Sequence, residues 1–188
     1  MSGGYATPRV DVRPWTHEDV DVMYDVYRRW EVARWLGAPP KVAQSVDEMH
    51  ERVDRWGAFC TEPGPFGAWA VVPRELGTPV GTVLLLPLDR GAGGQPGEVE
   101  VGWHLHPDAW GHGYATETGR GALEQAWLAG IPEVWAVLYE DNVRSAAVAR
   151  RLGMEPQGLT DRWYGVELLA FLARRPDDTG RAAAYQGP

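Results

Sequence analysis

The residues most suggestive of chemistry form a glycine-containing loop in the second half of the chain. The stretch Trp110-Gly111-His112-Gly113-Tyr114-Ala115-Thr116-Glu117 follows a predicted strand and opens a predicted helix. Its two glycines allow a tight turn and leave backbone N–H groups uncovered by side chains. A loop of this kind at a helix N-terminus can cradle a phosphate or a pyrophosphate, because the N–H groups and the helix dipole both attract an anion. The loop therefore indicates a phosphate-bearing ligand.

Three other interpretations of this loop compete. A P-loop requires Gly-Lys-Ser/Thr after its spacer, and the sequence contains no such tripeptide. A dinucleotide fingerprint requires glycine or alanine where Thr116 stands, and an acid near the end of the next strand, where Glu140 is only loosely spaced. The third interpretation is a helix-start turn that binds nothing.

The helix that follows favours a binding role over a plain turn. Small residues recur along it at spacings of four and three, at Ala115, Gly119, Ala122, Ala126 and Ala129. Such a stripe lets a helix lie close against a sheet. We therefore expect the helix to hold the loop rigidly at the ends of the strands.

Three histidines near the loop raise the question of a metal site. His104 and His106 form an H-x-H pair on a predicted strand, and His112 lies in the loop. No cysteine and no third ligand at a metal-binding spacing accompanies them, so we expect no metal. The single cysteine, Cys60, lies in an apolar setting and is predicted to be a buried, inert thiol.

Hydrophobic periodicity places these residues in an α/β (α+β) chain with a mixed sheet. It predicts strands at 10–14, 66–72, 80–86, 98–105, 134–139 and 166–173, and helices at 18–30, 45–56, 114–129 and 143–152. Residues 73–79 are predicted to join two strands as a hairpin, and 91–97 to form a glycine-rich loop. We expect residues 1–175 to form a single domain, followed by a frayed tail at 176–188.

Composition excludes several classes of protein. The 188 residues carry 18 Lys and Arg against 26 Asp and Glu, for a formal net charge of −8, so nucleic acid is not an expected partner. No apolar stretch is as long as a membrane helix, which needs about 18 residues, and residues 1–8 lack the apolar core of a signal peptide. A single cysteine fits a reducing compartment. These features predict a cytoplasmic protein without a membrane partner.

Four motifs occur in the order and spacing of a known family. They are Glu100-Val101-Gly102-Trp103, the loop of residues 110–117, Asn142-Val143-Arg144-Ser145 and Arg151-Leu152-Gly153-Met154. On these motifs the sequence resembles the GNAT superfamily of acetyl-CoA-dependent N-acetyltransferases. The RimJ/RimL-like branch, which acetylates the N-termini of ribosomal proteins, is the most similar. The resemblance spans roughly residues 10–173 and implies a single-domain, mostly antiparallel central sheet with helices on both faces.

The resemblance also implies how a co-substrate would bind. The loop amides would hold the pyrophosphate of acetyl-CoA, and its pantetheine arm would lie in a V-shaped splay between strands 98–105 and 134–139. Trp110 stands where the family more generally has Gln or Arg, although an aromatic residue is common in this branch. The residues implied in cofactor binding are His104, Leu105, His106, Trp110, Gly111, His112, Gly113, Tyr114, Ala115, Thr116, Asn142 and Ser145.

Acetyl transfer to an amine requires a route for the amine proton. Members of the family often use a carboxylate on the strand that lines the cleft, which makes Glu100 the leading candidate for the general base. Glu98 and His104 compete with it, and a solvated strand acid without a role is the alternative. An unbulged strand would point Glu100 and His104 to one face, whereas the bulge usual in this family would not.

Ser145 is the candidate donor toward the departing CoA thiolate. Many family members have a tyrosine four residues further on, where this chain has Ala149. A serine hydroxyl is a poor acid, so we expect Ser145 to stabilise the sulfur through a hydrogen bond. The alternative is that Ser145 is only the third residue of a helix capped by Asn142, which N-cap statistics explain without a ligand.

The acceptor and the assembly are less defined. Of ten tryptophans, Trp30, Trp35, Trp56 and Trp103 come from segments that flank the acceptor side in this family, although core packing explains tryptophans as well. The resemblance predicts a small-molecule or peptide amine as acceptor, for a monomer or a homodimer, and the acid surplus favours a cationic amine. The alternative functions are a CoA-binding sensor that has lost catalysis and a nucleotide-cofactor oxidoreductase.

Overall fold

The computed structural model describes residues 3–61, 64–88 and 97–176. Eight strands form one sheet in the order β1-β2-β3-β4-β5-β6-β8-β7, and every neighbouring pair is antiparallel except β5 and β6. The strands are β1 (Tyr5–Ala6), β2 (Val10–Pro14), β3 (Gly67–Pro73), β4 (Gly81–Pro87), β5 (Val99–Leu105), β6 (Glu133–Leu138), β7 (Glu155–Thr160) and β8 (Leu168–Arg174).

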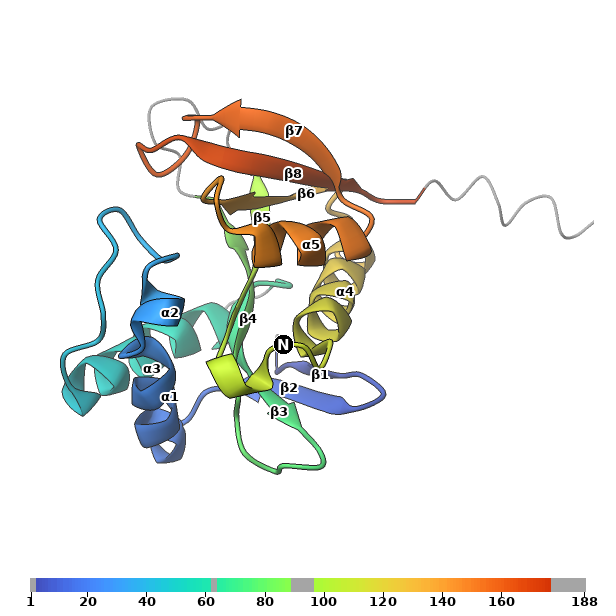
Figure 1. Cartoon of the computed structure of the whole chain (residues 1–188). Helices are drawn as coiled ribbons and strands as arrows, with labels where there is room; N and C mark the ends of the chain where they lie inside the picture. Colours follow the sequence, from blue (N-terminus) through green and yellow to red (C-terminus); the bar gives the residue numbers. More distant parts are fainter. Residues whose placement is uncertain (1–2, 62–63, 89–96, 177–188) are drawn as a thin grey trace, which may run out of the picture.

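Helices cover both faces of this sheet (Figure 1). On one side lie α1 (Val20–Tyr27), α2 (Trp30–Ala33) and α3 (Val46–Thr61), and on the other lie α4 (Tyr114–Leu128) and α5 (Val143–Arg151). Two 3₁₀ turns, η1 (His17–Asp19) and η2 (Pro107–Ala109), precede α1 and the glycine loop. The predicted fold class, a mostly antiparallel mixed sheet with helices on both faces, is confirmed.

Strand β3 shows why the core has two layers. All seven of its residues are buried, and successive side chains point to opposite faces. Trp69 and Val71 pack in the core beneath α4, whereas Ala70 and Val72 pack in the core beneath α1 and α3. Because helices cover both faces of the sheet at β3, the side chains on both faces of this strand are apolar, and the sequence reads as a continuous apolar run.

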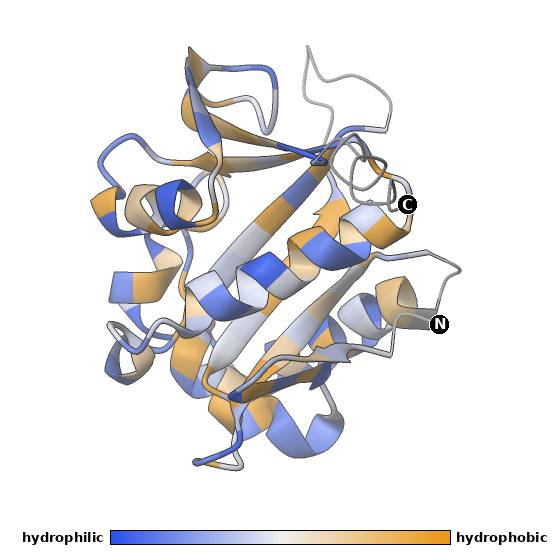
Figure 2. Cartoon of the chain, turned by 90° about the vertical axis from the view of Figure 1, so that its right-hand side faces the viewer, coloured by the Kyte–Doolittle hydropathy of each residue, from blue (hydrophilic) through white to orange (hydrophobic). Residues whose placement is uncertain are grey.

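The predicted small-residue stripe does bring α4 close to the sheet. Figure 2 views the molecule from the α4 side, where this helix lies in front of the central strands. Ala122 and Ala126 are fully buried, and a Cβ atom added to Gly119 would stand 3.7 Å from the Trp103 ring of β5. Ala129, the last member of the predicted stripe, instead lies at the C-cap and is exposed.

The splay between the two central strands is present. Strand β5 pairs with β4 along its whole length, from Gly81 opposite Leu105 to Pro87 opposite Val99, without a register shift. Its pairing with β6 is confined to Glu100 opposite Trp135. The two strands therefore diverge beyond Glu100, as the resemblance implied. The bulge that would have separated the faces of Glu100 and His104 does not occur in the β4–β5 pairing.

The structure differs from the sequence-based expectation in two places. The predicted helix 18–30 is divided into η1, α1 and α2, because Arg29 is extended, with φ −81° and ψ 123°. Strand β7 was not predicted: it is an almost wholly exposed edge strand containing Pro156 and Gly158, so it has no apolar alternation. The predicted glycine-rich loop, apart from Gly97, and the predicted tail, apart from Pro176, lie outside the described residues.

Candidate active site

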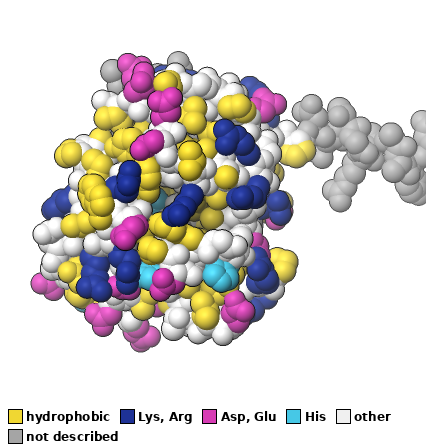
Figure 3. Space-filling model, viewed as in Figure 1, with side chains coloured by type: hydrophobic (Ala, Val, Ile, Leu, Met, Phe, Trp, Pro, Cys, Tyr) yellow, Lys and Arg dark blue, Asp and Glu magenta, His cyan; other side chains and the backbone are white. Residues whose placement is uncertain are grey.

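A cavity of about 1260 Å³ opens where β5 and β6 separate. Its walls come from these two strands, the glycine loop, the start of α5, α2 with the segment after it, and the connection between β7 and β8. In Figure 3, basic side chains stand among hydrophobic ones near the middle of one face of the molecule. Most predicted site residues line the cavity: Glu100, His104, Leu105, Trp110, Gly111, Gly113, Tyr114, Ala115, Thr116, Asn142 and Ser145.

The glycine loop presents free backbone donors to this cavity. Gly111 and Gly113 both have φ of 84°, in the left-handed region that favours glycine, and Gly113 is the N-cap of α4. Within the described part of the chain, the N–H groups of Tyr114, Ala115 and Thr116 donate no hydrogen bond. These amides are the unsatisfied donors of a helix N-terminus, where the helix dipole favours an anion. The loop can therefore hold an anionic group.

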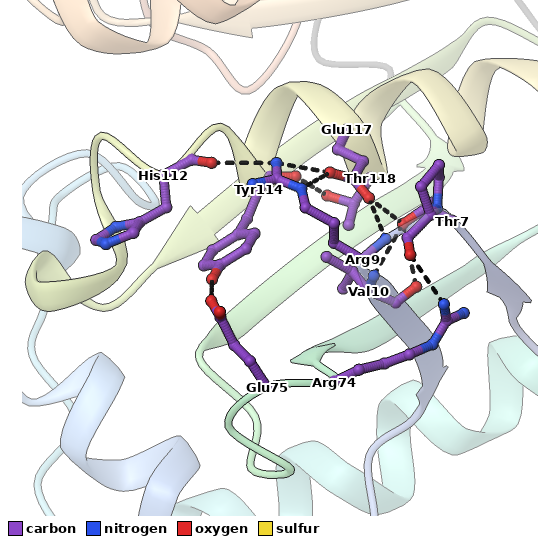
Figure 4. A network of polar contacts seen from close by, with 10 residues as sticks. Thr7, Arg9, Val10, Arg74, Glu75, His112, Tyr114, Glu117 and Thr118 are labelled. Carbon is purple, nitrogen blue, oxygen red and sulfur yellow. Dashed lines mark hydrogen bonds and ion pairs between the residues drawn. The ribbon is translucent and has the colours of Figure 1, made fainter.

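The opposite side of the loop is fixed by a network that the sequence did not reveal (Figure 4). Arg9 donates to the carbonyl oxygen of His112 at 3.1 Å and to the Glu117 carboxylate at 2.8 Å. Thr7 donates to the same carboxylate at 2.7 Å. Burial disfavours the ionised form of Glu117, but the hydrogen bonds from Thr7 and Arg9 outweigh it and lower its pKa. The ion pair thereby ties the loop and the first turn of α4 to the segment before β2.

A tyrosine in the loop adds a second attachment. The Tyr114 hydroxyl donates to the carboxylate of Glu75, which lies in the β3–β4 connection. The guanidinium of Arg9 lies over the Tyr114 ring at 5.3 Å, and the His112 ring stacks on it with centroids 5.6 Å apart. Side chains on the outer surface thus hold the loop while its amides face the cavity.

The Trp110 side chain contacts residues of two neighbouring elements. Its indole N–H donates to the carbonyl oxygen of Leu105 at 2.8 Å, which fixes the end of β5 to the loop. The guanidinium of Arg144, on α5, lies over the indole ring at 4.4 Å. The indole therefore connects β5, the loop and α5 at one end of the cavity.

Two predicted cofactor residues lie away from the large cavity. His106 and His112 line a smaller cavity of about 590 Å³ on the α1 side. The backbone N–H of His106 donates to the carbonyl oxygen of Val80 at 2.8 Å. The ring Nε2 of His106 lies 3.1 Å from an Asp25 carboxylate oxygen. Among the described residues, no group of His, Cys, Asp or Glu is placed to hold a metal ion.

Glu100 stands at the apex of the splay, where β5 and β6 still pair. It is half-buried, and its carboxylate accepts a hydrogen bond from the Tyr164 hydroxyl. Burial raises the pKa of Glu100 to about 7, against the opposing effect of the Tyr164 hydrogen bond. A carboxyl with this pKa can take up and release a proton near neutral pH, which suits a general base.

Glu98, the competing acid, is engaged elsewhere. Its carboxylate accepts hydrogen bonds from Arg162 and from the indole N–H of Trp163, the latter at 2.9 Å. It is absent from the lining of the large cavity. Glu98 therefore anchors the β7–β8 connection, and Glu100 is the acid of this strand that faces the cavity.

His104 lies on the same face of β5 as Glu100, but within a buried polar network. Its Nδ1 lies 3.2 Å from the Tyr27 hydroxyl, which lies 2.7 Å from the hydroxyl of Thr82. Burial, with Arg52 adding to it, lowers the pKa of His104 to about 4. His104 is therefore neutral at physiological pH, and a neutral imidazole with this pKa is a weak base.

Asn142 and Ser145 form the start of α5 at the edge of the cavity. Asn142 is buried, and its side-chain oxygen accepts the Ser145 N–H at 3.2 Å, so the predicted N-cap of α5 is confirmed. Both residues also line the cavity. The Ser145 hydroxyl makes no hydrogen bond within the described residues, which leaves it available to a ligand.

Aromatic residues line the opposite side of the cavity. Trp35 packs against Tyr139 with ring centroids 6.5 Å apart, and the Tyr139 hydroxyl donates to the Gly37 carbonyl at 2.7 Å. Trp103 also lines the cavity, whereas Trp30 and Trp56 do not. Tyr139 and Tyr164 were missed in the sequence because no motif marks them.

Comparison with known proteins identifies the family. A family model described as Acetyltransferase (GNAT) domain matches residues 9–155. The chain belongs to the GNAT acetyltransferase family. An uncharacterised N-acetyltransferase, p20 of Bacillus licheniformis, is similar to this GNAT chain, with 21% identity over 154 residues that cover 81% of this chain and 83% of the relative.

Solved structures share the GNAT fold. A GNAT acetyltransferase from Bacillus anthracis superposes with a TM-score of 0.73 at 15% identity, covering 91% of this chain and 98% of the other. RimL, a ribosomal-protein acetyltransferase in complex with coenzyme A, superposes with a TM-score of 0.71 at 14% identity, covering 90% and 96%. These likenesses establish the architecture of the GNAT chain.

Family membership settles the general activity. This GNAT chain is an acetyltransferase enzyme of the kind that transfers an acetyl group from acetyl-CoA to an amine. In the described part of the chain, no helix has the length and apolar character needed to cross a bilayer.

Proposed function

We propose that this enzyme acetylates a primary amine by direct attack on acetyl-CoA, with Glu100 as the general base, as a member of the RimJ/RimL-like branch. One observation carries the proposal. The same cavity holds unpartnered amides of a helix N-terminus at the glycine loop and, on the wall formed by β5, a carboxyl whose pKa is about 7. The first feature suits the diphosphate of acetyl-CoA and the second suits the amine.

The splayed strands provide the place for the pantetheine arm. Beyond Glu100, β5 and β6 are not paired with each other, and residues of both strands line the cavity. Their facing backbone groups are available to the amides of pantetheine, as in the addition of a strand. In this proposal the amides of Gly113, Tyr114, Ala115 and Thr116 hold the pyrophosphate. The other cavity residues of the predicted set, His104, Leu105, Trp110, Gly111 and Asn142, flank the arm.

The reaction then balances without a further reactant. The neutral amine nitrogen attacks the thioester carbonyl carbon, and a tetrahedral intermediate forms. Glu100 accepts the proton that the nitrogen loses, directly or through water, and the C–S bond breaks. The Ser145 hydroxyl hydrogen-bonds the departing sulfur. The proton held by Glu100 then passes through solvent to the thiolate, which gives free CoA and restores the carboxylate. Positioning of the two substrates supplies much of the rate in such a scheme.

The cavity wall opposite the loop favours an amine with an apolar body. Trp35 and Tyr139 offer ring surfaces there, and Glu31, on α2, adds an acid to the lining. Acids attract a cationic ammonium, and rings accommodate its carbon skeleton. The proposed acceptor is a small-molecule amine or a peptide N-terminus, rather than nucleic acid or a membrane. RimL acts on a ribosomal protein, which fits the cytoplasmic location that we propose. We propose a single catalytic domain of residues 1–175, as a monomer or a homodimer.

A panel of amines tests this function. Purified protein is incubated with acetyl-CoA and with aromatic amines, polyamines, amino acids or N-terminal peptides, and free CoA is followed with a thiol reagent. Amine-dependent release of CoA is the expected result. Titration calorimetry with acetyl-CoA and with NAD separates the alternatives. Binding of acetyl-CoA without turnover of any amine would favour a sensor, and tight NAD binding without CoA binding would favour an oxidoreductase.

Removing Arg9 tests whether the outer network positions the loop. In Arg9→Ala, the loop loses its hydrogen bond at the His112 carbonyl and its ion pair at Glu117. The substitution does not change the backbone amides of the loop. We expect the KM for acetyl-CoA to rise about fivefold, a cost of about 1 kcal/mol for an exposed ion pair. The kcat should stay within about twofold, since Arg9 touches neither reacting group.

Arg74→Ala is the matched control for Arg9. Arg74 pairs with Asp11 on the same surface but makes no contact with the loop. Its KM for acetyl-CoA should equal that of the wild type. Equal KM values for all three proteins would show that the loop keeps its shape without the network.

Removing the Ser145 hydroxyl tests its assignment toward sulfur. Ser145→Ala keeps the N–H that Asn142 caps, so α5 should fold as before. We expect kcat to fall about tenfold, the effect of losing one hydrogen bond to a charged group, with little change in the acetyl-CoA dissociation constant. Single-turnover rates and calorimetry measure the two quantities. An unchanged kcat would leave Ser145 as a helix residue only.

A further inference from the structure

The connection between β7 and β8 is held firmly against β5 and β6. The Trp163 side chain is 1% exposed, and its indole N–H donates to Glu98. Arg162 pairs with the same carboxylate and lies over the rings of Trp163, at 4.6 Å, and Trp135, at 5.4 Å. This anchor fixes the position of the next residue, Tyr164, beside Glu100.

Tyr164 has a backbone conformation that a tyrosine rarely adopts. Its φ is 58°, the one positive value among the non-glycine residues that the structure describes. A left-handed conformation costs a residue with a side chain about 1–2 kcal/mol, and Gly165 follows with φ of 68°. A glycine at 164 would avoid this cost. The strain therefore points to a use for the tyrosine side chain.

That side chain reaches the base. Tyr164 lines the large cavity, and its hydroxyl donates to the Glu100 carboxylate. The other charged or titratable groups lining the cavity are Glu31 from α2, His104 from β5, Tyr114 from α4, Tyr139 after β6, and Arg144 and Arg151 from α5. Among the described residues, none of these groups is hydrogen-bonded or ion-paired with Glu100.

We propose that Tyr164 is a positioning residue whose hydroxyl aims the Glu100 carboxylate at the acceptor amine and favours its ionised form. The inference rests on the proposed function, since it assigns Glu100 as the base. The hydrogen bond is donated to the carboxylate, so it stabilises the charged state that can accept a proton. Burial acts in the opposite direction and raises the pKa of Glu100, so the Tyr164 hydrogen bond increases the fraction of carboxylate that is ionised.

A titration that needs no catalysis tests the contact. The carboxyl carbons of glutamate are labelled with ¹³C, and the Glu100 signal is assigned by its absence in Glu100→Gln. Its chemical shift is followed against pH in the wild type and in Tyr164→Phe. We expect Tyr164→Phe to raise the midpoint by about one pH unit, the effect of one hydrogen bond to a charged acceptor. An unchanged midpoint would overturn the proposal.

Two further variants secure the interpretation. Tyr139→Phe removes another hydroxyl from the same cavity, one bonded to Gly37, and should leave the Glu100 midpoint where it is. Tyr164→Gly relieves the positive φ, so it should be folded at least as well as Tyr164→Phe and show the same raised midpoint. A midpoint shift in Tyr139→Phe as large as in Tyr164→Phe would mean that the cavity, not Tyr164, controls Glu100.

Kinetics connect the contact to catalysis. In Tyr164→Phe, the acidic limb of the kcat/KM profile should move to higher pH by the same amount as the carboxyl titration, while the KM for acetyl-CoA stays constant. If the titration moves and the limb does not, Glu100 is not the base and Tyr164 is not a positioning residue for it. The acetyltransferase activity itself would stand in that case. If no amine is turned over at all, the proposed function fails while the carboxyl titration still decides the contact.

Discussion

Glu100→Gln is expected to lower kcat about 100-fold or more, the usual contribution of a general base. Glutamine keeps the shape of the side chain and can still accept the Tyr164 hydrogen bond, but it cannot take the proton that the amine loses. The acetyl-CoA dissociation constant should not change, because the glycine loop lies at the far end of β5. Steady-state kinetics at saturating acetyl-CoA, together with calorimetry, measure both quantities.

The pH profile distinguishes this role from a structural one. With a pKa of about 7, Glu100 ionises as the pH rises, so wild-type kcat/KM should fall below that pH. The limb should be missing from the residual activity of Glu100→Gln. Glu31→Gln, which removes another acid of the cavity lining, should keep the limb. A limb that persists in Glu100→Gln would remove Glu100 from the mechanism.

The same substitution should raise stability at alkaline pH. Folding raises the pKa of Glu100 from 4.5 to about 7. At a pH between these two values the folded protein therefore binds more protons than the unfolded chain. Stability is therefore lost as the pH rises through this window, by about 3 kcal/mol once the pH is above 7. Glu100→Gln escapes this loss. Denaturant unfolding should show it more stable than the wild type at pH 8 and similar at pH 4.5.

Gly113→Ala is expected to weaken acetyl-CoA binding by about tenfold or more. Gly113 has φ of 84° at the N-cap of α4, a conformation that alanine resists. A Cβ atom would also stand 3.4 Å from the Arg9 guanidinium, which holds the loop. When the residue moves to relieve these contacts, the following amides no longer converge on one anion. The loss of one hydrogen bond to a charged group accounts for this factor.

Gly130→Ala is the control for backbone strain. Gly130 follows α4 with φ of 81°, and an added Cβ atom would meet nothing within 4 Å. Both variants should lose about 1 kcal/mol of stability, since both place alanine in the left-handed region. Calorimetry should show weaker acetyl-CoA binding for Gly113→Ala alone. Equal affinities in the two variants would exclude the loop as the diphosphate site.

The parts of the fold that follow from local rules were predictable. Short β-branched or apolar runs marked β2, β3, β4, β6 and β8, and alternation of acids with apolar residues marked β5. The two glycines followed by small residues marked the loop and α4. The four family motifs were enough to predict the splay. Strand β7 escaped because its edge position requires no apolar face, and α2 escaped because one extended residue, Arg29, interrupts an otherwise helical stretch.

Partners within the site were not predictable in the same way. Glu98 and Glu100 are equivalent in the sequence pattern, yet Arg162 and Trp163 donate hydrogen bonds to Glu98 and Tyr164 donates one to Glu100. Residues more than sixty positions away therefore decide the hydrogen-bond partners of each acid. The sequence also gave no sign that Arg9 reaches the glycine loop, because isolated ion pairs carry no spacing signal.

The sequence by itself determined the family, the glycine loop at the start of α4 and the cap of α5, because each depends on neighbouring residues with fixed spacing. The tertiary structure alone decided which acid faces the cavity, that His106 and His112 lie outside it, and that Tyr164 meets Glu100. The physical reason is that burial and charge pairing depend on distances in space. The pKa of Glu100 is therefore set by the packing around it.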